Sequence, residues 1–535
     1  MLSFLLFVTG VVLLIDTTLL VVFDSGWSAF GYGLSMVFFY LARKTAQKEE
    51  TLHASGWDIG PGLDIENPDQ PKKVHVVLED KALNLGLLAI GGPGSGKTIM
   101  ALGSLHYYTT QRGGGWCYWE GKGDLDIYQK CVACGAAPDK FFSCELPHSD
   151  TVNVFAGPVE NVIERLSRTL ISDESEYYGN AQRSALRKVV PLLKSLDVPT
   201  TLQDLYVVLR IPAASLYVMN KAKEQGVDNH VIESARLFFE IDEKERMNQI
   251  NGLLNRMDVF VTGQIADRIN AYQPTLDLQE AATQGWKVYL HMPYTRLAKD
   301  VATMLTESVG VIATRRQLYE TARQPWPQVF DDWGAFFYDN FGPITARCRS
   351  AGMPISFLFQ SRGQTDRVEA GRIFTTEVTD NIGGMVILRI NGQDTAEWAA
   401  NQFGRYETAE LSRTENTSYE GNNLTMKEAP RVKSDTLRDL DAGEAYINCL
   451  VTGAAGRIDN KRYLTRFPML DFKDSDSVKW PVIATIKNND CEGLHLWRDF
   501  MDKDRLKELK KQIVEKELEK SSADATSRVR EVDHL

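Results

Sequence analysis

The spacing of hydrophobic positions changes along the chain, and this change predicts the fold class. Short continuous apolar runs, bounded by glycine or charged residues, are typical of strands buried on both faces of a parallel sheet. Segments with apolar residues at helical spacing separate these runs, and this order is typical of α/β proteins. The predicted strands are residues 74–77, 87–90, 116–119, 151–155, 286–291, 328–333, 354–359 and 385–390.

A long stretch of purely helical spacing marks a separate region. From residue 158 to residue 282, apolar positions recur at helical spacing and few β-branched runs interrupt them. We therefore predict an inserted all-helical domain, a kind of insertion that usually carries specificity. The remaining predicted boundaries are a linker at residues 45–71, the α/β domain at residues 72–157 and 283–470, and a charged C-terminal tail at residues 471–535.

Two apolar runs at the amino terminus predict a membrane anchor. Residues 2–23 contain few polar positions, and as a helix they would extend about 33 Å, enough to cross the hydrocarbon core. A second, shorter apolar run at residues 27–42 is followed by Arg43 and Lys44. These cations predict that the rest of the chain lies in the cytoplasm. We expect residues 1–44 to form a two-helix transmembrane anchor, not a cleavable signal peptide.

Composition excludes some classes of protein. A hydrophobic fraction of 43% and a charged fraction of 24% are ordinary for a globular protein. The net charge of −11 argues against a protein that coats itself in nucleic acid, although a local basic channel stays possible. Seven cysteines in 535 residues do not suggest a disulfide framework. Cys131 and Cys134 form a lone C-x-x-C pair, for which buried thiols are the default interpretation and a metal site the alternative.

One motif predicts nucleotide binding. Residues 91–98 fit G-x-x-x-x-G-K-[ST], between an apolar run that predicts a strand and an apolar face that predicts a helix. Glycines let backbone N–H groups surround an anion, and the helix adds its positive N-terminal end. Lys97 is expected to reach the β- and γ-phosphates of ATP, and the Thr98 hydroxyl to bind Mg²⁺. The predicted nucleotide-binding residues are Gly91, Gly92, Pro93, Gly94, Ser95, Gly96, Lys97 and Thr98.

Two later strand ends carry candidate catalytic groups. Asp331 and Asp332 follow an apolar pair. In P-loop ATPases the first carboxylate at such a position holds Mg²⁺, and the second polarises the attacking water. Gln360 ends the predicted strand at residues 354–359, where a polar amide would lie near the γ-phosphate and that water. We therefore predict Asp331 as a metal ligand, Asp332 as a catalytic residue and Gln360 as a sensor of the γ-phosphate.

Taken in order, these motifs resemble the coupling ATPases of type IV secretion systems. Those inner-membrane proteins recruit DNA or protein substrates and belong to a superfamily of hexameric translocases with RecA-like motor domains. The resemblance covers the anchor and most of residues 72–465. The matching features are the paired spans, residues 91–98, residues 120–124, Asn153, the helical insertion, Asp331 and Asp332, Arg349 with Gly352, Gln360 with Ser361 and Gln364, and residues 440–445.

The resemblance implies a RecA-like P-loop motor in a bacterial inner membrane, multi-pass, assembled as a homo-hexamer. It implies Arg349 as an arginine finger that reaches a neighbouring subunit's γ-phosphate, with other nearby arginines as competitors. The implied partners are inner-membrane components of the secretion channel, and a DNA–relaxase complex or a protein substrate or adaptor. Whether the cargo is DNA or protein stays open. The competing arginines are Arg347, Arg362 and Arg389.

Departures from the family pattern keep two alternatives open. The family has Asp-Glu where this chain has Asp331 and Asp332, and Asp where this chain has Glu120. Slow hydrolysis would suit a nucleotide-binding receptor scaffold rather than a motor. A DNA pump of the chromosome-segregation type is the other alternative. The thin apolar stripe at residues 506–518 predicts a solvated helix or a docking segment for a chaperone or substrate.

Overall fold

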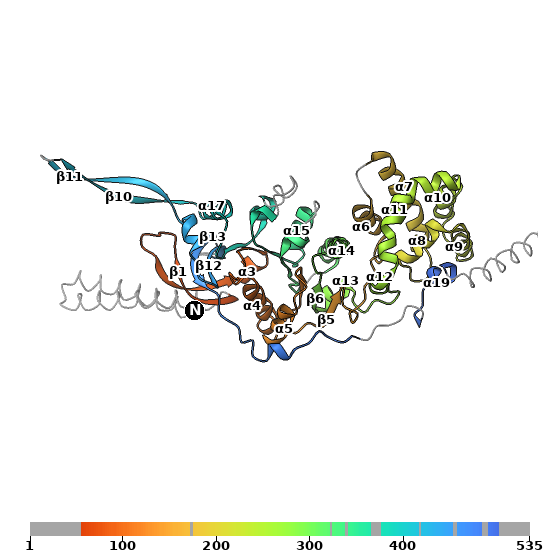
Figure 1. The fold of residues 1–535 in the computed structure, drawn as a ribbon, viewed down its shortest axis with the longest axis horizontal. Helices are drawn as coiled ribbons and strands as arrows, with labels where there is room; N and C mark the ends of the chain where they lie inside the picture. Colours follow the sequence, from red (N-terminus) through yellow and green to blue (C-terminus); the bar gives the residue numbers. More distant parts are fainter. Residues whose placement is uncertain are drawn as a thin grey trace, which may run out of the picture.

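The computed structural model describes most of the chain after residue 54, and it shows a sheet covered by helices with an all-helical region beside it (Figure 1). The described residues are 55–171, 175–320, 324–336, 341–364, 376–416, 419–452, 457–483 and 490–501.

A single mixed sheet runs through the α/β part of the chain. Its strand order is β2-β1-β13-β12-β9-β3-β8-β7-β4-β6-β5, eleven strands within the described residues. From β9 to β5 all neighbours pair in parallel, and from β2 to β9 all neighbours pair antiparallel. The strands are β1 (Gly56–Asp64), β2 (Lys72–Glu79), β3 (Leu87–Ile90), β4 (Trp116–Glu120), β5 (Lys140–Ser143), β6 (Lys287–His291), β7 (Gln328–Asp331), β8 (Ile355–Phe359), β9 (Gly384–Ile387), β12 (Glu444–Thr452) and β13 (Ile458–Arg466).

Helices cover both faces of the parallel part, and the alternation of side chains divides the core between them. Leu88 and Phe357 belong to the cluster that includes residues of α14, whereas Ala89 and Leu358 belong to the cluster of α4 and α5. Burial on both faces explains why these strands are continuous apolar runs. The helices of this region are α3 (Asp80–Leu83), α4 (Lys97–Thr110), α5 (Leu125–Ala133), α13 (Leu278–Gln284), α14 (Arg296–Tyr319), α15 (Phe341–Ser350), α17 (Gln393–Asn401), α18 (Ser434–Arg438) and the short 3-10 turns η1 (Trp333–Ala335), η2 (Arg362–Gln364) and η4 (Ser475–Ser477).

An all-helical region lies between β5 and β6 in the chain and beside the sheet in space (Figure 1). Local capping fixes several of its helix starts. At α8, for example, Thr201 and Asp204 exchange side-chain and backbone hydrogen bonds in a capping box. Its helices are α6 (Val159–Leu170), α7 (Glu176–Lys194), α8 (Leu202–Arg210), α9 (Pro212–Glu224), α10 (Asn229–Phe239), α11 (Glu243–Val261) and α12 (Gly263–Ile269).

A separate two-stranded ribbon projects from the α/β part of the chain (Figure 1). It consists of β10 (Arg405–Asn416) and β11 (Tyr419–Pro430), paired antiparallel. Its base is tied to the turn before β2, because the hydroxyls of Tyr406 and Thr408 donate to the Asp69 carboxylate at 2.8 and 2.6 Å. The sequence analysis did not predict this ribbon.

Two sequence-based expectations were wrong in detail. Residues 151–155 do not form a strand but only an isolated bridge between Asn153 and Asn270. Two of their backbone N–H groups bond the C-terminal end of α12 instead, with Val152 donating to Arg268 at 2.7 Å. The edge strand is β5, which the analysis missed. The expected linker at residues 45–71 contains β1, whose pairing with β2 and β13 makes it part of the sheet.

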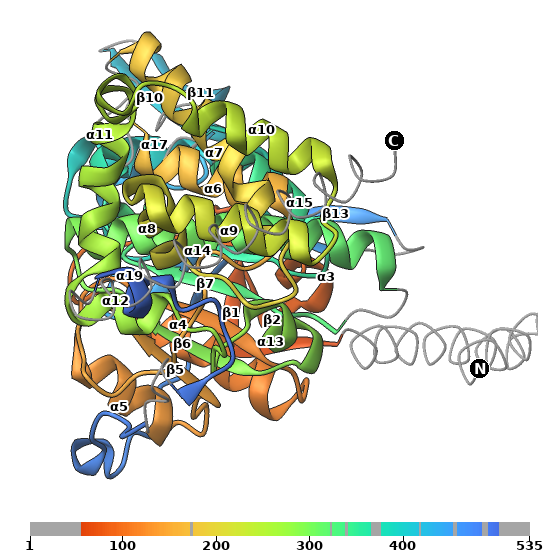
Figure 2. The ribbon, with the colours of Figure 1, turned by 90° about the vertical axis from the view of Figure 1, so that its right-hand side faces the viewer.

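The last described part of the chain leaves the sheet and packs against the all-helical region. After β13, the Trp480 ring packs against Tyr128 and Phe141 at centroid distances of 5.1 and 5.4 Å. Further on, α19 (Leu496–Met501) packs against α8 (Figure 2). The buried carboxylate of Asp204 accepts the backbone N–H of Leu496 at 3.0 Å. Part of the expected tail is therefore packed structure.

Among the described residues, no helix has both the length and the apolar character needed to cross a bilayer. The two predicted spans, residues 2–23 and 27–42, lie outside the described part of the chain.

Candidate functional site

The glycine-rich loop is held between the ends of two neighbouring strands. The backbone N–H of Gly91 donates to Phe359 of β8 at 3.2 Å, and that of Gly92 donates to Arg389, just beyond β9, at 2.7 Å. These bonds continue the ladder of the sheet past β3, so the loop starts from a rigid base. The sequence therefore places the loop at the C-terminal edge of a parallel sheet, where ligands bind in open α/β folds.

Two glycines of the loop adopt backbone conformations that other residues disfavour. Gly94 has φ +68° and Gly96 has φ +102°. A Cβ at Gly96 would also lie 3.0 Å from the backbone nitrogen of Gly443, which itself donates to Ser95 at 2.9 Å. The turn before β12 thus braces the loop, and only glycine fits at the contact.

Lys97 begins α4 with its ammonium group turned back into the loop. Its Nζ donates to the carbonyl oxygens of Gly91 and Gly92, the second at 3.2 Å. Burial lowers the pKa of Lys97 to about 8, and the nearby Asp331 carboxylate opposes that shift. The side chain is therefore already in the place from which it would contact a bound triphosphate.

Asp331 at the end of β7 faces Thr98. Its Oδ2 accepts the Thr98 hydroxyl at 3.2 Å and the Tyr118 hydroxyl at 2.8 Å. Its other oxygen, Oδ1, is buried and has no hydrogen-bond partner among the described residues. An orphaned carboxylate oxygen beside a hydroxyl suits a hard divalent cation or its water shell. The residues present therefore fit Mg²⁺, and the metal-ligand role of Thr98 and Asp331 stays a prediction.

Two side chains on β4 contribute to this part of the site. No role here was predicted for either of them from the sequence. Tyr118 orients Asp331 through its hydroxyl. Glu120, fully buried at the strand end, accepts the backbone N–H groups of Lys122 and Gly123 at 2.7 to 3.0 Å. Burial raises the pKa of Glu120 to about 7, against the opposing effect of those donors. Tyr118 and Glu120 are two residues apart on a strand, so their side chains share a face. This spacing was the signal in the sequence from which a shared role in the site could have been predicted.

Asp332 and Gln360 lie together at the adjacent strand ends. The Gln360 amide nitrogen donates to Asp332 Oδ1 at 3.3 Å, and its backbone N–H donates to Gln364 at 3.0 Å. Asp332 has φ +58°, in the left-handed region that few non-glycine residues adopt. Because the backbone changes direction after Asp331, the carboxylates of Asp331 and Asp332 lie at different positions in the site. Their catalytic roles stay predictions.

Arg349 is exposed on the last turn of α15. There Nη1 donates to Asn381 Oδ1 at 3.4 Å, so the side chain is not brought to the loop of its own chain. Its predicted role as an arginine finger requires a neighbouring subunit and stays a prediction. Of the competitors, Arg362 lies over the ring of Trp398, 5.7 Å from its centroid, whereas Arg389 lies beside Gly94.

Cys131 and Cys134 are buried thiols that donate to backbone carbonyls. The Cys131 thiol donates to Ala136 at 3.1 Å and the Cys134 thiol to Cys131 at 3.2 Å. Burial raises the pKa of both thiols, which disfavours the thiolates that a metal needs. Within the described ranges, no group of three or more His, Cys, Asp or Glu residues is arranged to hold a metal.

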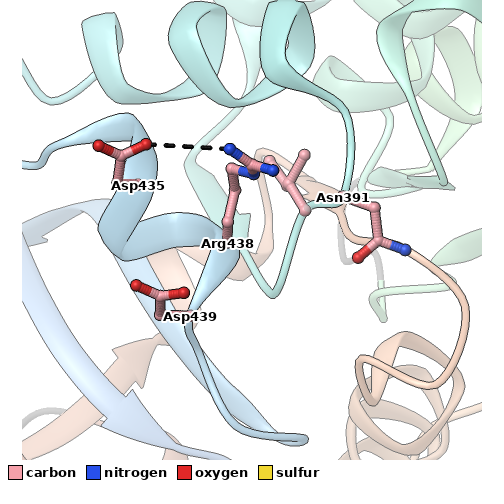
Figure 3. A pocket seen from close by; sticks show the side chains of 5 residues that line it. Asn391, Asp435, Arg438 and Asp439 are labelled. Atoms are coloured by element: carbon pink, nitrogen blue, oxygen red, sulfur yellow. Dashed lines mark ion pairs between the residues drawn. The ribbon is translucent and has the colours of Figure 1, made fainter.

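A cavity of about 490 Å³ opens beside the loop (Figure 3). Its walls are Ile390 and Asn391 on one side and residues of α18 and the following turn, Asp435, Arg438 and Asp439, on the other. Asp435 and Arg438 form an ion pair at 3.9 Å. The Asn391 amide closes over Gly92, where a Cβ would lie 3.0 Å from its nitrogen. Asn391 therefore lines the cavity and also lies beside Gly92 of the nucleotide loop.

The fold and the site together define a class. A parallel sheet with the glycine-rich loop after a central strand, and a carboxylate at the tip of the next strand but one, is a RecA-like P-loop fold. The antiparallel strands extend this sheet at one edge, and the all-helical region is inserted at the other.

No family model and no curated protein sequence matches the chain. Several solved structures, in contrast, match the chain in fold. The bacterial conjugative coupling protein TrwBΔN70, in its unbound form, has a TM-score of 0.54 at 15% identity, over 77% of this chain and 90% of that one. The plasmid coupling protein TrwB with the GTP analogue GDPNP has a TM-score of 0.53 at 15% identity, over 76% and 90%. TrwB with ADP and Mg²⁺ has a TM-score of 0.51 at 14% identity, over 77% and 89%. This chain therefore shares the fold of those coupling proteins.

Proposed function

We propose that the chain is an ATPase of the coupling-protein type, which uses ATP to drive DNA or protein substrates into a type IV secretion channel. The observation that carries this proposal is the convergence of Lys97, Thr98 and Asp331 at one end of the parallel sheet. The fold likeness to TrwB, whose solved structures hold GDPNP or ADP with Mg²⁺, supports the choice of a nucleotide and of magnesium.

In this proposal the loop of residues 91–98 holds the phosphates through backbone N–H groups at the start of α4. Lys97 exchanges its bonds to Gly91 and Gly92 for bonds to phosphate oxygens. Thr98 and Asp331 would hold Mg²⁺, and the chemistry it would supply is neutralisation of negative charge on the terminal phosphates. Tyr118 keeps Asp331 in one orientation through its bond to Oδ2, which leaves Oδ1 without a partner among the described residues.

Asp332 and Gln360 position and polarise the attacking water, and they start from direct contact with each other. Arg349 of one subunit stabilises charge on the nucleotide of the next, which explains why it is exposed in a single chain. Such a site is complete only at an interface between subunits. The active state we propose is therefore a homo-hexamer, in which nucleotide turnover moves neighbouring subunits.

The proposed location is the bacterial inner membrane, with residues 1–44 as the two-helix anchor and the motor in the cytoplasm. The all-helical region, residues 158–282, meets the cargo, which is a DNA–relaxase complex or a protein substrate or adaptor. Inner-membrane components of the secretion channel are the other partners. The fold of the conjugative coupling protein supports this placement by likeness alone.

A second candidate is a receptor scaffold that binds nucleotide and scarcely hydrolyses it. The observation that favours it is Asp332, whose short side chain accepts a hydrogen bond from the Gln360 amide. Both candidates require nucleotide binding at the same loop, so only turnover separates them.

The test is steady-state ATP hydrolysis by the full-length chain in detergent micelles, with and without single-stranded DNA. A motor predicts turnover that DNA stimulates and that Lys97→Ala abolishes, while Lys130→Ala, a change at an exposed ion pair of α5, has no effect. Turnover absent under every condition, together with tight binding of ATP, would instead support the scaffold. Failure to bind any nucleotide would refute both.

A further inference from the structure

Arg389, one of the competing candidates for the arginine finger, lies beside the nucleotide loop of its own chain. Arg389 follows β9, and its backbone is built into the base of the loop: Leu388 donates to Ile90 at 2.8 Å, and Gly92 donates to Arg389 at 2.7 Å. Its Nη2 lies 3.8 Å from the point where a Cβ would stand on Gly94, the one heavy atom found within 4 Å of that point. The guanidinium group therefore lies beside the loop at Gly94.

The guanidinium group of Arg389 is also unpaired. The side chain is half-buried, and within the described residues neither a hydrogen bond nor an ion pair involves its nitrogens. Other arginines of comparable or greater burial are engaged. Arg165 donates to Val154 at 2.6 Å, Arg268 to Cys144 at 2.6 Å and Arg316 to Glu320 at 2.9 Å. Because a partly desolvated cation is normally paired, Arg389 is placed to receive an anion.

The position of Lys97 indicates which anion this is. The Lys97 ammonium lies at the carbonyls of Gly91 and Gly92, and in such loops that ammonium contacts the β- and γ-phosphates. The terminal phosphates therefore belong to the first half of the loop. Gly94, which lies beside Arg389, is in the same half. Arg389 is thus directed at the end of the triphosphate that hydrolysis removes.

We propose that Arg389 binds the γ-phosphate of the nucleotide held by its own chain, as an arginine finger in cis. This inference rests on the proposed function. It differs from the predicted role of Arg349, which serves a neighbouring subunit. Arginine suits the role because its planar group donates two parallel hydrogen bonds to phosphate oxygens. Arg389 also makes the loop sensitive to the third phosphate, since a diphosphate leaves the guanidinium group without its partner.

The test compares affinities for tri- and diphosphate nucleotides, a readout that does not depend on turnover. The full-length chain in detergent is titrated with Mg²⁺·ATPγS and with Mg²⁺·ADP by competition against a fluorescent ADP. Arg389→Ala is expected to weaken ATPγS binding by roughly tenfold to a hundredfold, because a charge-assisted bond is lost, and to change ADP affinity by less than about threefold. Arg389→Lys keeps the charge and is expected to recover part of the loss.

The matched control is Arg405→Ala, an exposed arginine at the start of β10 that pairs with Glu428 at 3.5 Å; it is expected to change neither affinity. Equal weakening of both nucleotides by Arg389→Ala and Arg389→Lys, or no weakening of either, would overturn the inference. Lys97→Ala separates this outcome from failure of the proposed function. Suppose that Lys97→Ala abolishes nucleotide binding while Arg389→Ala leaves the ratio of ATPγS affinity to ADP affinity unchanged. The nucleotide site is then supported, and the cis role of Arg389 is refuted.

Discussion

The hydroxyl of Thr98 donates a hydrogen bond to Asp331 at 3.2 Å, although 233 positions separate the two residues in the chain. Thr98 is fixed by the first turn of α4, and Asp331 by the last residue of β7. Between β3 and β7 lies β8, which brings Gln360 to the same edge. The sheet thus assembles one site from three strand ends and a helix start.

Tyr118 is expected to tune metal affinity through Asp331. Tyr118→Phe removes the hydroxyl that donates to Asp331 Oδ2, so the carboxylate loses its fixed orientation. Loss of such an orienting partner typically weakens metal binding by about tenfold to a hundredfold. The measurement is the Mg²⁺ concentration at half-maximal binding of ADP. Nucleotide affinity in EDTA is expected to stay unchanged.

The control for that prediction is on the neighbouring strand. Tyr289 stacks near Tyr118, at a centroid distance of 5.4 Å, and its buried hydroxyl has no partner among the described residues. Tyr289→Phe is therefore expected to leave Mg²⁺ dependence as it is. A similar shift in both variants would mean that packing of the rings, not the bond to Asp331, sets metal affinity.

Asp332 is expected to control turnover without controlling binding. Asp332→Asn keeps the shape and tolerates the left-handed backbone, but it removes the carboxylate that would polarise water. Hydrolysis by the full-length chain should fall by about a hundredfold or more, with ATPγS affinity within about twofold of wild type. Asp332→Glu, one methylene longer, should raise turnover. Wild-type turnover in Asp332→Asn would remove Asp332 from the chemistry.

Much of this site could be predicted because its signals are local. The loop at residues 91–98 carries its own strand and helix context, and Asp331 and Gln360 are marked by polar residues at the ends of apolar runs. Strands buried on both faces have continuous apolar sequences, so β3, β4, β6, β7, β8 and β9 were all expected near their observed places.

The remaining features depend on contacts between distant residues. Residues 151–155 have the composition of a strand, yet their backbone bonds the C-terminal end of α12, which no local pattern indicates. The orientation of Asp331 by Tyr118 follows from the order of β4 and β7 in the sheet. Likewise, the packing of α19 on α8 depends on Asp204, a buried carboxylate whose partner is 292 residues away.

Nucleotide affinity is expected to depend on pH through Lys97. The free protein holds this amine with a pKa of about 8, lowered by burial and by Lys122 against the pull of Asp331 and Asp332. A bound phosphate requires the protonated form, so above pH 8 binding must take up a proton. The dissociation constant of Mg²⁺·ADP should be flat from pH 7 to 8 and rise up to about tenfold per pH unit above it.

Lys97→Arg tests that assignment, because a guanidinium group stays protonated throughout this range. Whatever its absolute affinity, the variant should lose the rise between pH 8 and pH 9.5. If the rise persists, another group carries the titration. Calorimetry in buffers of different ionisation enthalpy measures the proton uptake directly.

The C-terminal segment is expected to stabilise the helical region. Leu496 is fully buried where α19 meets α8, and Leu496→Ala should cost about 2–4 kcal/mol of local stability. Hydrogen exchange of the α8 amides measures this loss of local stability even if the α/β part of the chain unfolds separately. Met469→Ala, at a side chain that is 79% exposed, should leave exchange unchanged. Unaltered protection of α8 in Leu496→Ala would show that α19 only rests on the surface.

The most direct test of the central claim is an experimental structure of the full-length chain with Mg²⁺ and a non-hydrolysable ATP analogue. We predict a metal ion bound by the Thr98 hydroxyl and held by Asp331 directly or through one water, with the Lys97 ammonium moved from the carbonyls of Gly91 and Gly92 to the terminal phosphates. A nucleotide bound elsewhere, or a metal ion out of reach of Asp331, would contradict the account.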